Sequence, residues 1–189
     1  MTPVDRSKYM DAEEVQRLRS VAAGWAALDL AAGRKTGPLV WAVVDTALST
    51  GLRVAELAAL RHDDLDLGRK ALRVTRRKRR TPITETLALP DELVRHLGEF
   101  IEWKELVGEP TGPDDGLFIG KRGPLTVSGL QRVWKSAIRK AGLPAELSIH
   151  SARHTLAVHL LERTGNLRQV QKQLGHADPA VTANLYADV

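Results

Sequence analysis

Cysteine is absent from the 189-residue chain. Its absence excludes disulfide bonds, thiolate-based zinc sites and a cysteine nucleophile, and it is consistent with a reducing compartment. Long hydrophobic runs are absent as well. No apolar stretch reaches the roughly 20 residues that a membrane-spanning helix requires, and the N-terminal stretch lacks the apolar centre of a signal peptide. We therefore expect a cytoplasmic protein without a membrane partner.

Aromatic residues are scarce, at 4% of the chain, whereas 43% of the residues are hydrophobic. The core must therefore be built mainly from leucine, valine and alanine. A chain of this length can bury enough apolar surface to fold as one domain. The sequence contains no internal repeat and no low-complexity block, which agrees with that expectation.

Positive charge exceeds negative charge. The formal net charge is +5, and arginine supplies 19 of the 28 basic residues. Guanidinium groups bind phosphate oxygens in a bidentate geometry. A polyanion is therefore the favoured partner, with nucleic acid ahead of an acidic membrane. Charge alone fits equally well a soluble protein that happens to be basic.

Hydrophobic periodicity predicts a mainly α-helical domain with one small antiparallel β-sheet, an α+β fold. Residues 64–90 alternate apolar and polar positions and are rich in Val, Thr, Ile and Leu, which favours strands, with Gly68 at the first turn and the run RRKRR at or near the second. Helical spacing, caps and glycine or proline stops predict helices over about 11–32, 38–48, 53–61, 91–108, 125–144, 150–163, 167–174 and 179–186.

The first segment that indicates chemistry is TGLRVAEL, residues 50–57. Gly51 allows a sharp turn, and Arg53 follows on the first turn of a predicted helix. Glu56 lies three residues further on, close enough to hold the guanidinium group of Arg53. Taken alone, the pair is explained more simply as a surface ion pair that contributes less than ~1 kcal/mol.

The second segment is SIHSARHTLAVHLLERTG, residues 148–165. His150 and Arg153 lie three residues apart on the first turn of a predicted helix, where free backbone N–H groups favour an anion. This pattern predicts a phosphate-binding turn, and the alternative is a solvated, basic helix start. Further along, Gly175 is followed at once by His176, and Tyr186 is one of only two tyrosines in the chain.

Four motifs, TGLRVAEL, HSARHT, LGH and TANLYADV, resemble in order and spacing the catalytic boxes of the tyrosine recombinases, the phage-integrase and Xer-type family. The resemblance covers roughly residues 10–189 and implies the catalytic-domain fold of that family. It also implies that Tyr186 is the nucleophile and that Glu56 supports the first arginine. The side chains that it places around a scissile DNA phosphate are Arg53, His150, Arg153 and His176.

The family also has a catalytic lysine in the turn between two strands. The segment LRVTRRKRRTPI, residues 72–83, contains only Lys78, which we take as the equivalent. The hairpin is short for the family, so Arg77 could occupy that position instead, although arginine is a poor acid because its pKa exceeds 12. A plain phosphate-binding turn is the alternative for the whole run. The arginines expected to bind DNA there are Arg76, Arg77, Arg79 and Arg80.

The chemistry of DNA cleavage explains these residue types. A tyrosine phenol has a pKa near 10, so its attack on phosphorus requires proton removal or nearby positive charge. Two guanidinium groups and imidazole N–H groups can stabilise the negative transition state without a metal, and a lysine can protonate the leaving 5′ oxygen. A 3′-phosphotyrosine conserves the bond energy, and the chain has no G-x-x-x-x-G-K-[ST] phosphate loop. We therefore expect no ATP, no metal and no other cofactor.

A metal site is the rival interpretation of the second segment. His150, His154 and His159 could be ligands, since a four-residue spacing places two histidines on one helix face. The glutamate of an H-E-x-x-H motif is absent, however, and Arg153 would repel a divalent cation. Structural roles for His154 and His159 are therefore favoured.

The resemblance further implies a single catalytic domain over residues 1–189, without the separate N-terminal core-binding domain of the family. Double-stranded DNA is the expected partner, in a cytoplasmic, nucleoid-associated setting. We expect a tetramer on DNA for the full-length form and a monomer for the isolated domain. Site-specific recombination is the main functional hypothesis. The alternatives are DNA relaxation like that of type IB topoisomerases and DNA binding by a catalytically weak regulator.

Overall fold

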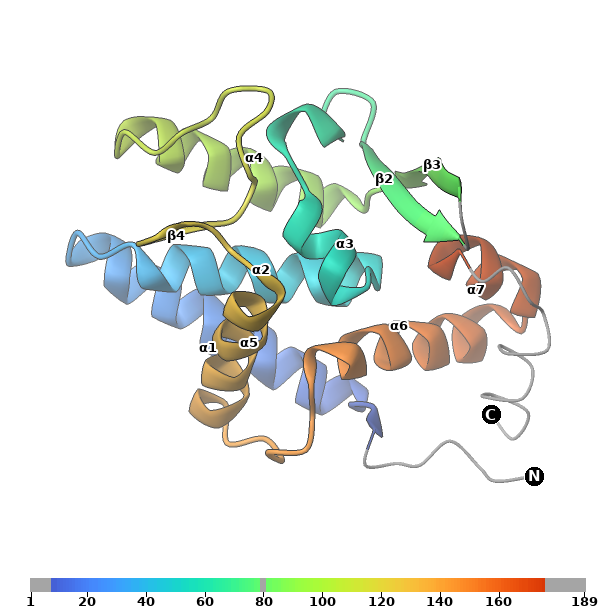
Figure 1. The fold of residues 1–189 in the computed structure, drawn as a ribbon. Helices are drawn as coiled ribbons and strands as arrows, with labels where there is room; N and C mark the ends of the chain where they lie inside the picture. Colours follow the sequence, from blue (N-terminus) through green and yellow to red (C-terminus); the bar gives the residue numbers. More distant parts are fainter. Residues whose placement is uncertain (1–7, 79–80, 176–189) are drawn as a thin grey trace.

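The computed structural model describes residues 8–78 and 81–175, with the backbone alone at residues 77, 78 and 81. Figure 1 shows a bundle of helices with a small sheet beside it. The helices are α1 (Ala12–Ala31), α2 (Thr36–Thr50), α3 (Val54–Ala59), α4 (Asp91–Leu106), α5 (Val127–Lys140), α6 (Ile149–Thr164) and α7 (Leu167–Leu174), with a 3-10 turn, η2 (His62–Asp64). The strands are β1 (Leu65–Asp66), β2 (Ala71–Lys78), β3 (Thr81–Ala88), β4 (Ile119–Gly120) and β5 (Gly123–Pro124).

The larger sheet is antiparallel, in the order β1-β2-β3. Its hairpin register runs from the pair Ala71–Ala88 to the pair Lys78–Thr81. Leu72 and Val74 are buried on one face of β2, as the period of two in a strand requires. The expected α+β architecture, with most residues in helices and a small antiparallel sheet, is confirmed.

Helix caps explain why several elements begin where they do. The Asp11 side chain accepts a hydrogen bond from the Glu14 backbone N–H at 2.8 Å, and Glu14 returns the bond, which forms a capping box before α1. Thr126 caps α5 through a single hydrogen bond, which its side-chain oxygen accepts from the Gly129 N–H. The short β4–β5 pair lies between the helices expected over 91–108 and 125–144, where no element was predicted. The helix expected over 179–186 lies outside the described residues.

The core is centred on α2, which Figure 1 shows between α1, α4, α5 and α6. Its buried side chains are small or branched, among them Val40, Val43 and Val44, as expected from the low aromatic content. Trp134 is a buried exception, and its indole N–H donates to the Leu147 carbonyl at 3.1 Å. Within residues 8–78 and 81–175, no helix combines the length and the apolar character that a membrane crossing requires.

A buried carboxylate fixes the joint between α1 and α2. Asp29 accepts hydrogen bonds from the Arg34 side chain and from the Gly37 backbone N–H, each at 2.7 Å. Burial by itself would raise the pKa of the Asp29 carboxyl. The two hydrogen bonds and the Arg34 charge outweigh burial, so this pKa lies below its usual value. Gly37 allows the close approach of the helices, since a Cβ there would lie 2.5 Å from the Trp25 carbonyl oxygen.

Asp29→Asn should lower the free energy of unfolding by about 1–3 kcal/mol at pH 7, because the amide must turn an NH₂ group toward one of two donors. The folded-state pKa of Asp29 is depressed, so its contribution is complete above the unfolded value of about 3.9 and disappears as the pH falls through the folded-state pKa. Urea denaturation at pH 7 and in acid measures both effects.

Glu102→Gln is the matched control, since Glu102 is an exposed carboxylate on α4 and its substitution should leave the midpoint unchanged. An equal destabilisation by Asp29→Asn at acidic and neutral pH would contradict the role given to the Asp29 charge.

Candidate functional site

The turn between α2 and α3 begins with a glycine that no other residue could replace without strain. Gly51 has a φ of +62° and caps α2. A Cβ at this position would lie 2.9 Å from the Cδ2 atoms of both Leu156 on α6 and Leu174 on α7. Gly51 therefore serves two purposes: it reverses the chain and lets three helices meet at one point.

Arg53 lies two residues after this turn and is held by a buried acid. The two carboxylate oxygens of Glu56 accept hydrogen bonds from the Arg53 backbone N–H at 2.8 Å and from its Nη1 at 3.0 Å. Glu56 is buried, whereas 45% of the Arg53 side chain is exposed. Glu56 is thus positioned to hold Arg53, as expected. The guanidinium group remains accessible to an anion from solvent.

Arg153 joins the ends of two helices to α6. Its Nη1 donates to the Gly51 carbonyl at 2.8 Å, and its Nη2 donates to the Leu174 carbonyl at 2.7 Å. The residue is only 8% exposed. Both acceptors belong to helix C-termini, whose carbonyls lack intrahelical donors and carry partial negative charge. Arg153 therefore fixes the first turn of α6 to the ends of α2 and α7.

Arg76 occupies a different place from the one expected. The sequence suggested an exposed side chain that binds DNA, but the structure buries Arg76, leaving 1% of it exposed. Its Nη1 donates to the Leu174 carbonyl, and its Nη2 donates to the Gln173 carbonyl at 3.2 Å. Its Nε lies 3.0 Å from a Glu85 carboxylate oxygen on β3. The guanidinium group thus faces the end of α7 and not the solvent.

The histidines of α6 differ in their surroundings. His150 is exposed on the first turn, while His154 and His159 are partly buried. Burial lowers the pKa of His154, and the positive charges of Arg153 and His150 lower it further. A neutral imidazole is therefore favoured at His154 near pH 7. Within the part of the chain that the structure describes, no three metal-ligating side chains form a group.

The remaining predicted residues are placed by backbone only or are not described. Lys78 ends β2 opposite Thr81, and Arg77 pairs with Pro82. Four predicted residues lie outside the described residues: Arg79, Arg80, His176 and Tyr186. What the structure does place together is the Gly51 turn, the start of α6 and the end of α7, joined through Arg153, with Arg53 two residues beyond that turn and Gly175 directly before His176.

The family model described as the phage integrase family matches residues 8–189. The chain belongs to this family. Its similar relatives include tyrosine recombinase XerC of Alcanivorax borkumensis, 34% identical over 142 residues, and tyrosine recombinase XerC of Chromohalobacter salexigens, 37% identical over 146 residues. Each match covers 75% of this chain and 45% of the relative, so the chain spans about half the length of the curated relatives.

Solved structures give the same phage integrase fold. The crystal structure of XerA recombinase has a TM-score of 0.77 at 27% identity and covers 96% of this chain and 58% of that one. The XerH recombinase bound to its difH substrate has a TM-score of 0.73 at 21% identity and covers 96% of this chain and 50% of that one. The expected tyrosine recombinase catalytic-domain fold is confirmed.

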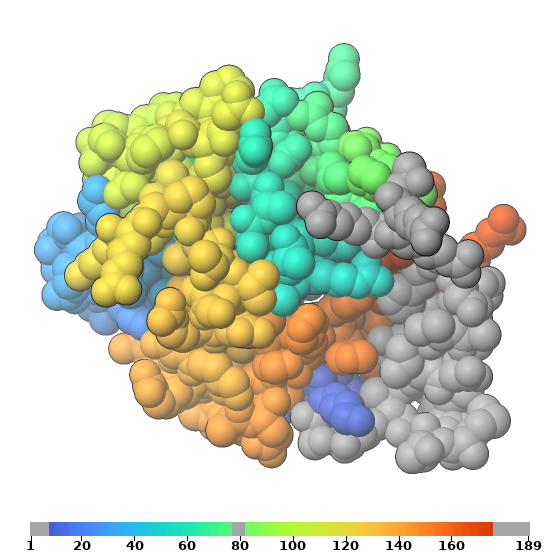
Figure 2. Space-filling view, viewed as in Figure 1, coloured from blue at the N-terminus to red at the C-terminus, as the bar shows by residue number. Residues whose placement is uncertain are grey.

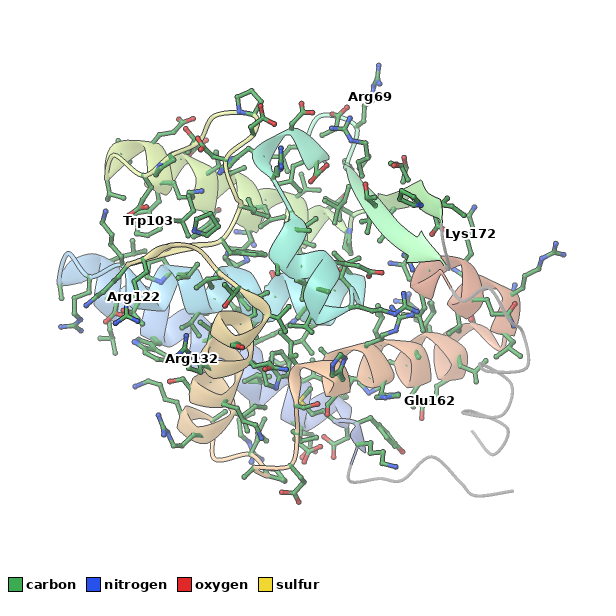
Figure 3. All side chains as sticks on the ribbon, in the orientation of Figure 1. Arg69, Trp103, Arg122, Arg132, Glu162 and Lys172 are labelled. Carbon is green, nitrogen blue, oxygen red and sulfur yellow. The ribbon has the colours of Figure 1, made fainter. Side chains whose placement is uncertain are left out.

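Basic residues that sequence reasoning missed lie around α5. Figure 2 shows α3, α5 and the start of α6 adjoining on one face of the domain, and Figure 3 labels Arg122 and Arg132 beside α5. Both arginines and Lys121 line one shallow hollow, and Lys135 is exposed one helical turn after Arg132. Arg132 and Lys135 lie three residues apart on a predicted helix, and Lys121 and Arg122 belong to the preceding GKRG segment. Together these two patterns could have indicated the basic surface from the sequence.

Gly51→Ala should destabilise this phage integrase domain by about 1–3 kcal/mol, because the new methyl group meets two leucine side chains at a strained φ. Gly24→Ala is the matched control. Gly24 lies within α1, and a Cβ added there would have no neighbouring atom within 4 Å, so alanine at this position should stabilise by about 0.5–1 kcal/mol. Thermal denaturation of both variants measures the difference, and equal effects would contradict the packing described for Gly51.

Proposed function

We propose that this chain cleaves and rejoins double-stranded DNA at specific sites through a 3′-phosphotyrosine at Tyr186. The observation that carries the proposal is the convergence at Arg153, whose two hydrogen bonds join the Gly51 turn to the end of α7. Three of the motifs that indicate phosphate chemistry thereby meet at one place. Membership of the phage integrase family and relatives named as tyrosine recombinases support the same reaction.

The proposed cleavage step needs neither a metal nor a nucleotide to account for its bonds and protons. The Tyr186 phenolic oxygen forms a bond to phosphorus as the bond between phosphorus and the 5′ oxygen breaks. The phenolic proton passes to a neutral imidazole, that of His150 or His176. The electron pair of the broken bond goes to the 5′ oxygen, which takes a proton from the Lys78 ammonium group. The reverse step rejoins the strand, so the phosphodiester energy is conserved.

The two arginines of the TGLRVAEL and HSARHT motifs have different roles in this scheme. Arg53 is exposed, with Glu56 holding its guanidinium in place, so it can meet a phosphate oxygen directly. Arg153 is largely buried and holds the backbone around the site in place. Positive groups that are oriented before DNA arrives need no reorganisation as charge develops on the phosphate.

We propose that DNA lies against the face formed by α3, α5 and the start of α6. Arg53 at the start of α3 and Arg132 on α5 are exposed, and Arg122 is exposed in the β4–β5 turn and lines the same hollow as Arg132. Contacts with phosphates supply most of the affinity for DNA. A tetramer on two paired DNA sites is the working form that we propose for the full-length recombinase.

Tyr186→Phe provides the first test. Wild-type protein incubated with supercoiled or nicked DNA in EDTA and stopped with SDS should yield protein attached to DNA 3′ ends, and sequencing these ends maps the cleavage site. Tyr186→Phe should abolish the adduct while DNA binding, measured by fluorescence anisotropy, persists, because phenylalanine lacks the attacking oxygen.

The assay separates the alternatives. A wild-type adduct whose formation requires EDTA-free buffer, or an adduct that survives Tyr186→Phe, would overturn the proposal. DNA binding without an adduct would favour the catalytically weak regulator. Adducts spread over all sequences, with relaxation of supercoils, would favour an activity like that of type IB topoisomerases.

Arg122→Ala and Arg132→Ala should each weaken binding to an arbitrary duplex and reduce the slope of log K against log salt by about one, as expected for the loss of one phosphate contact. Arg69→Ala is the control, because Arg69 is exposed at the turn before β2 and Figure 3 shows it pointing away from the domain. An unchanged slope in the α5 variants would place the DNA on another face.

A further inference from the structure

We propose that Arg76 is a positioning residue that ties the β2–β3 hairpin to the end of α7 and thereby places Lys78 for protonation of the leaving 5′ oxygen. The inference rests on the proposed DNA cleavage and deepens it. Arg76 precedes Lys78 by two residues on β2, and Leu174 and Gly175 directly precede His176. One guanidinium group therefore joins two segments that carry predicted catalytic residues.

Two of the three guanidinium nitrogens of Arg76 donate hydrogen bonds, and the third, Nε, lies near a carboxylate without forming one. Nη1 and Nη2 donate to the carbonyls of Leu174 and Gln173, and Nε faces a Glu85 carboxylate oxygen at 3.0 Å. The planar fork of arginine suits two adjacent carbonyls, whereas the single ammonium group of a lysine would not span them in the same way. With 1% of the residue exposed, this guanidinium group cannot serve as a DNA contact.

Gly175 leaves the space that Arg76 fills. Its φ is +63°, and a Cβ there would overlap the guanidinium group of Arg76. The left-handed conformation ends α7 at this residue, and the missing side chain admits the guanidinium group against the last carbonyls. Arg76 and Gly175 thus form one packing unit, although 98 residues separate Arg76 from Leu174 in the chain.

The Leu174 carbonyl also accepts the Nη2 of Arg153. A carbonyl oxygen has two lone pairs and can accept both arginines. Two guanidinium groups at one atom repel each other, but the negative end of the α7 dipole and the Glu85 carboxylate offset that repulsion for Arg76. Arg76 on the hairpin and Arg153 on α6 therefore both donate to the same carbonyl oxygen.

The hydrogen bonds of Arg76 connect the hairpin to the end of α7. The main packing partner of α7 is α6, while β2 packs chiefly on its sheet neighbours, α3 and η2. Figure 1 shows the end of β2 that carries Lys78 lying next to α7. Without the Arg76 guanidinium group, the hairpin would lose two hydrogen bonds to the end of α7, and the end of β2 at Lys78 would be less firmly fixed relative to that helix.

The test compares two leaving groups on a duplex that carries the cleavage site mapped by adduct sequencing. In one substrate the bridging 5′ atom is oxygen, which needs a proton to leave. In the other it is sulfur, which leaves as a thiolate without a proton. Arg76→Met should slow adduct formation on the oxygen substrate by about 100-fold, the cost of misplacing a catalytic group by about 1 Å, and should cleave the sulfur substrate at nearly the wild-type rate.

Matched variants define the comparison. Lys78→Met should show the same rescue by sulfur as Arg76→Met. Tyr186→Phe should be inactive on both substrates. Arg73→Met should behave as wild type on both, because Arg73 lies on the same strand with 49% of its side chain exposed and pairs with Asp63 outside the site. Glu85→Gln keeps the hairpin intact and should give a partial loss on the oxygen substrate only.

Each other outcome overturns the proposal. An equal loss on both substrates would make Arg76 a phosphate-binding or purely structural residue, and no loss on either would remove it from the reaction. If wild-type protein cleaves neither substrate, the proposed function itself fails. Hydrogen exchange then still tests the attachment: Arg76→Met should speed exchange at the β2–β3 amides and leave α2 unchanged, and unchanged hairpin exchange would show that Arg76 does not hold the hairpin.

Discussion

The carbonyl oxygen of Leu174 is the point on which the arrangement of the site depends. It ends α7, where a helix leaves its last carbonyls without donors. Arg153 from α6 and Arg76 from β2 both donate to it, and Arg153 also reaches the Gly51 carbonyl at the end of α2. Helix C-termini are negative, so the end of α7 attracts both cations, and the Glu85 carboxylate lies 3.0 Å from the Nε of Arg76. One orphan acceptor thus fixes three elements that are far apart in the sequence.

The glycines of the motifs follow from the same constraint. At Gly51 a side chain would meet leucines of α6 and α7, and at Gly175 it would displace the Arg76 guanidinium group. Both residues also have positive φ, which is costly for any residue with a Cβ. Chain reversal and close approach are therefore required at the same two positions. The glycine of TGLRVAEL lets leucines of α6 and α7 pack against the turn, and the glycine of LGH lets the Arg76 guanidinium group reach the last carbonyls of α7.

Local signals allowed much of the fold and part of the site to be predicted. The caps at Asp11 and Thr126 and the Arg53–Glu56 pair act over three residues, so the sequence displays them directly. The partners of Arg153 lie 102 and 21 residues away, and no local pattern indicates them. The exposure predicted for Arg76 was wrong because the run RRKRR suggests a solvated turn. Leu72, Val74 and Arg76 alternate along β2, and all three are buried. Because alternate residues of a strand share a face, this spacing predicts burial of Arg76 better than the charge of the short run does.

Burial divides the arginines of the site according to what they can do. Arg53 is open to solvent and held at its base by a buried carboxylate, so it can bind an incoming phosphate while keeping its orientation. Arg76 and Arg153 are buried, and their hydrogen bonds to backbone carbonyls leave little freedom to turn. Buried cations raise the local potential for an anion but cannot follow it as it moves. Such a site therefore favours a phosphate delivered in one geometry, and under the proposed function that phosphate is the scissile phosphate of a rigid DNA duplex, presented to Arg53.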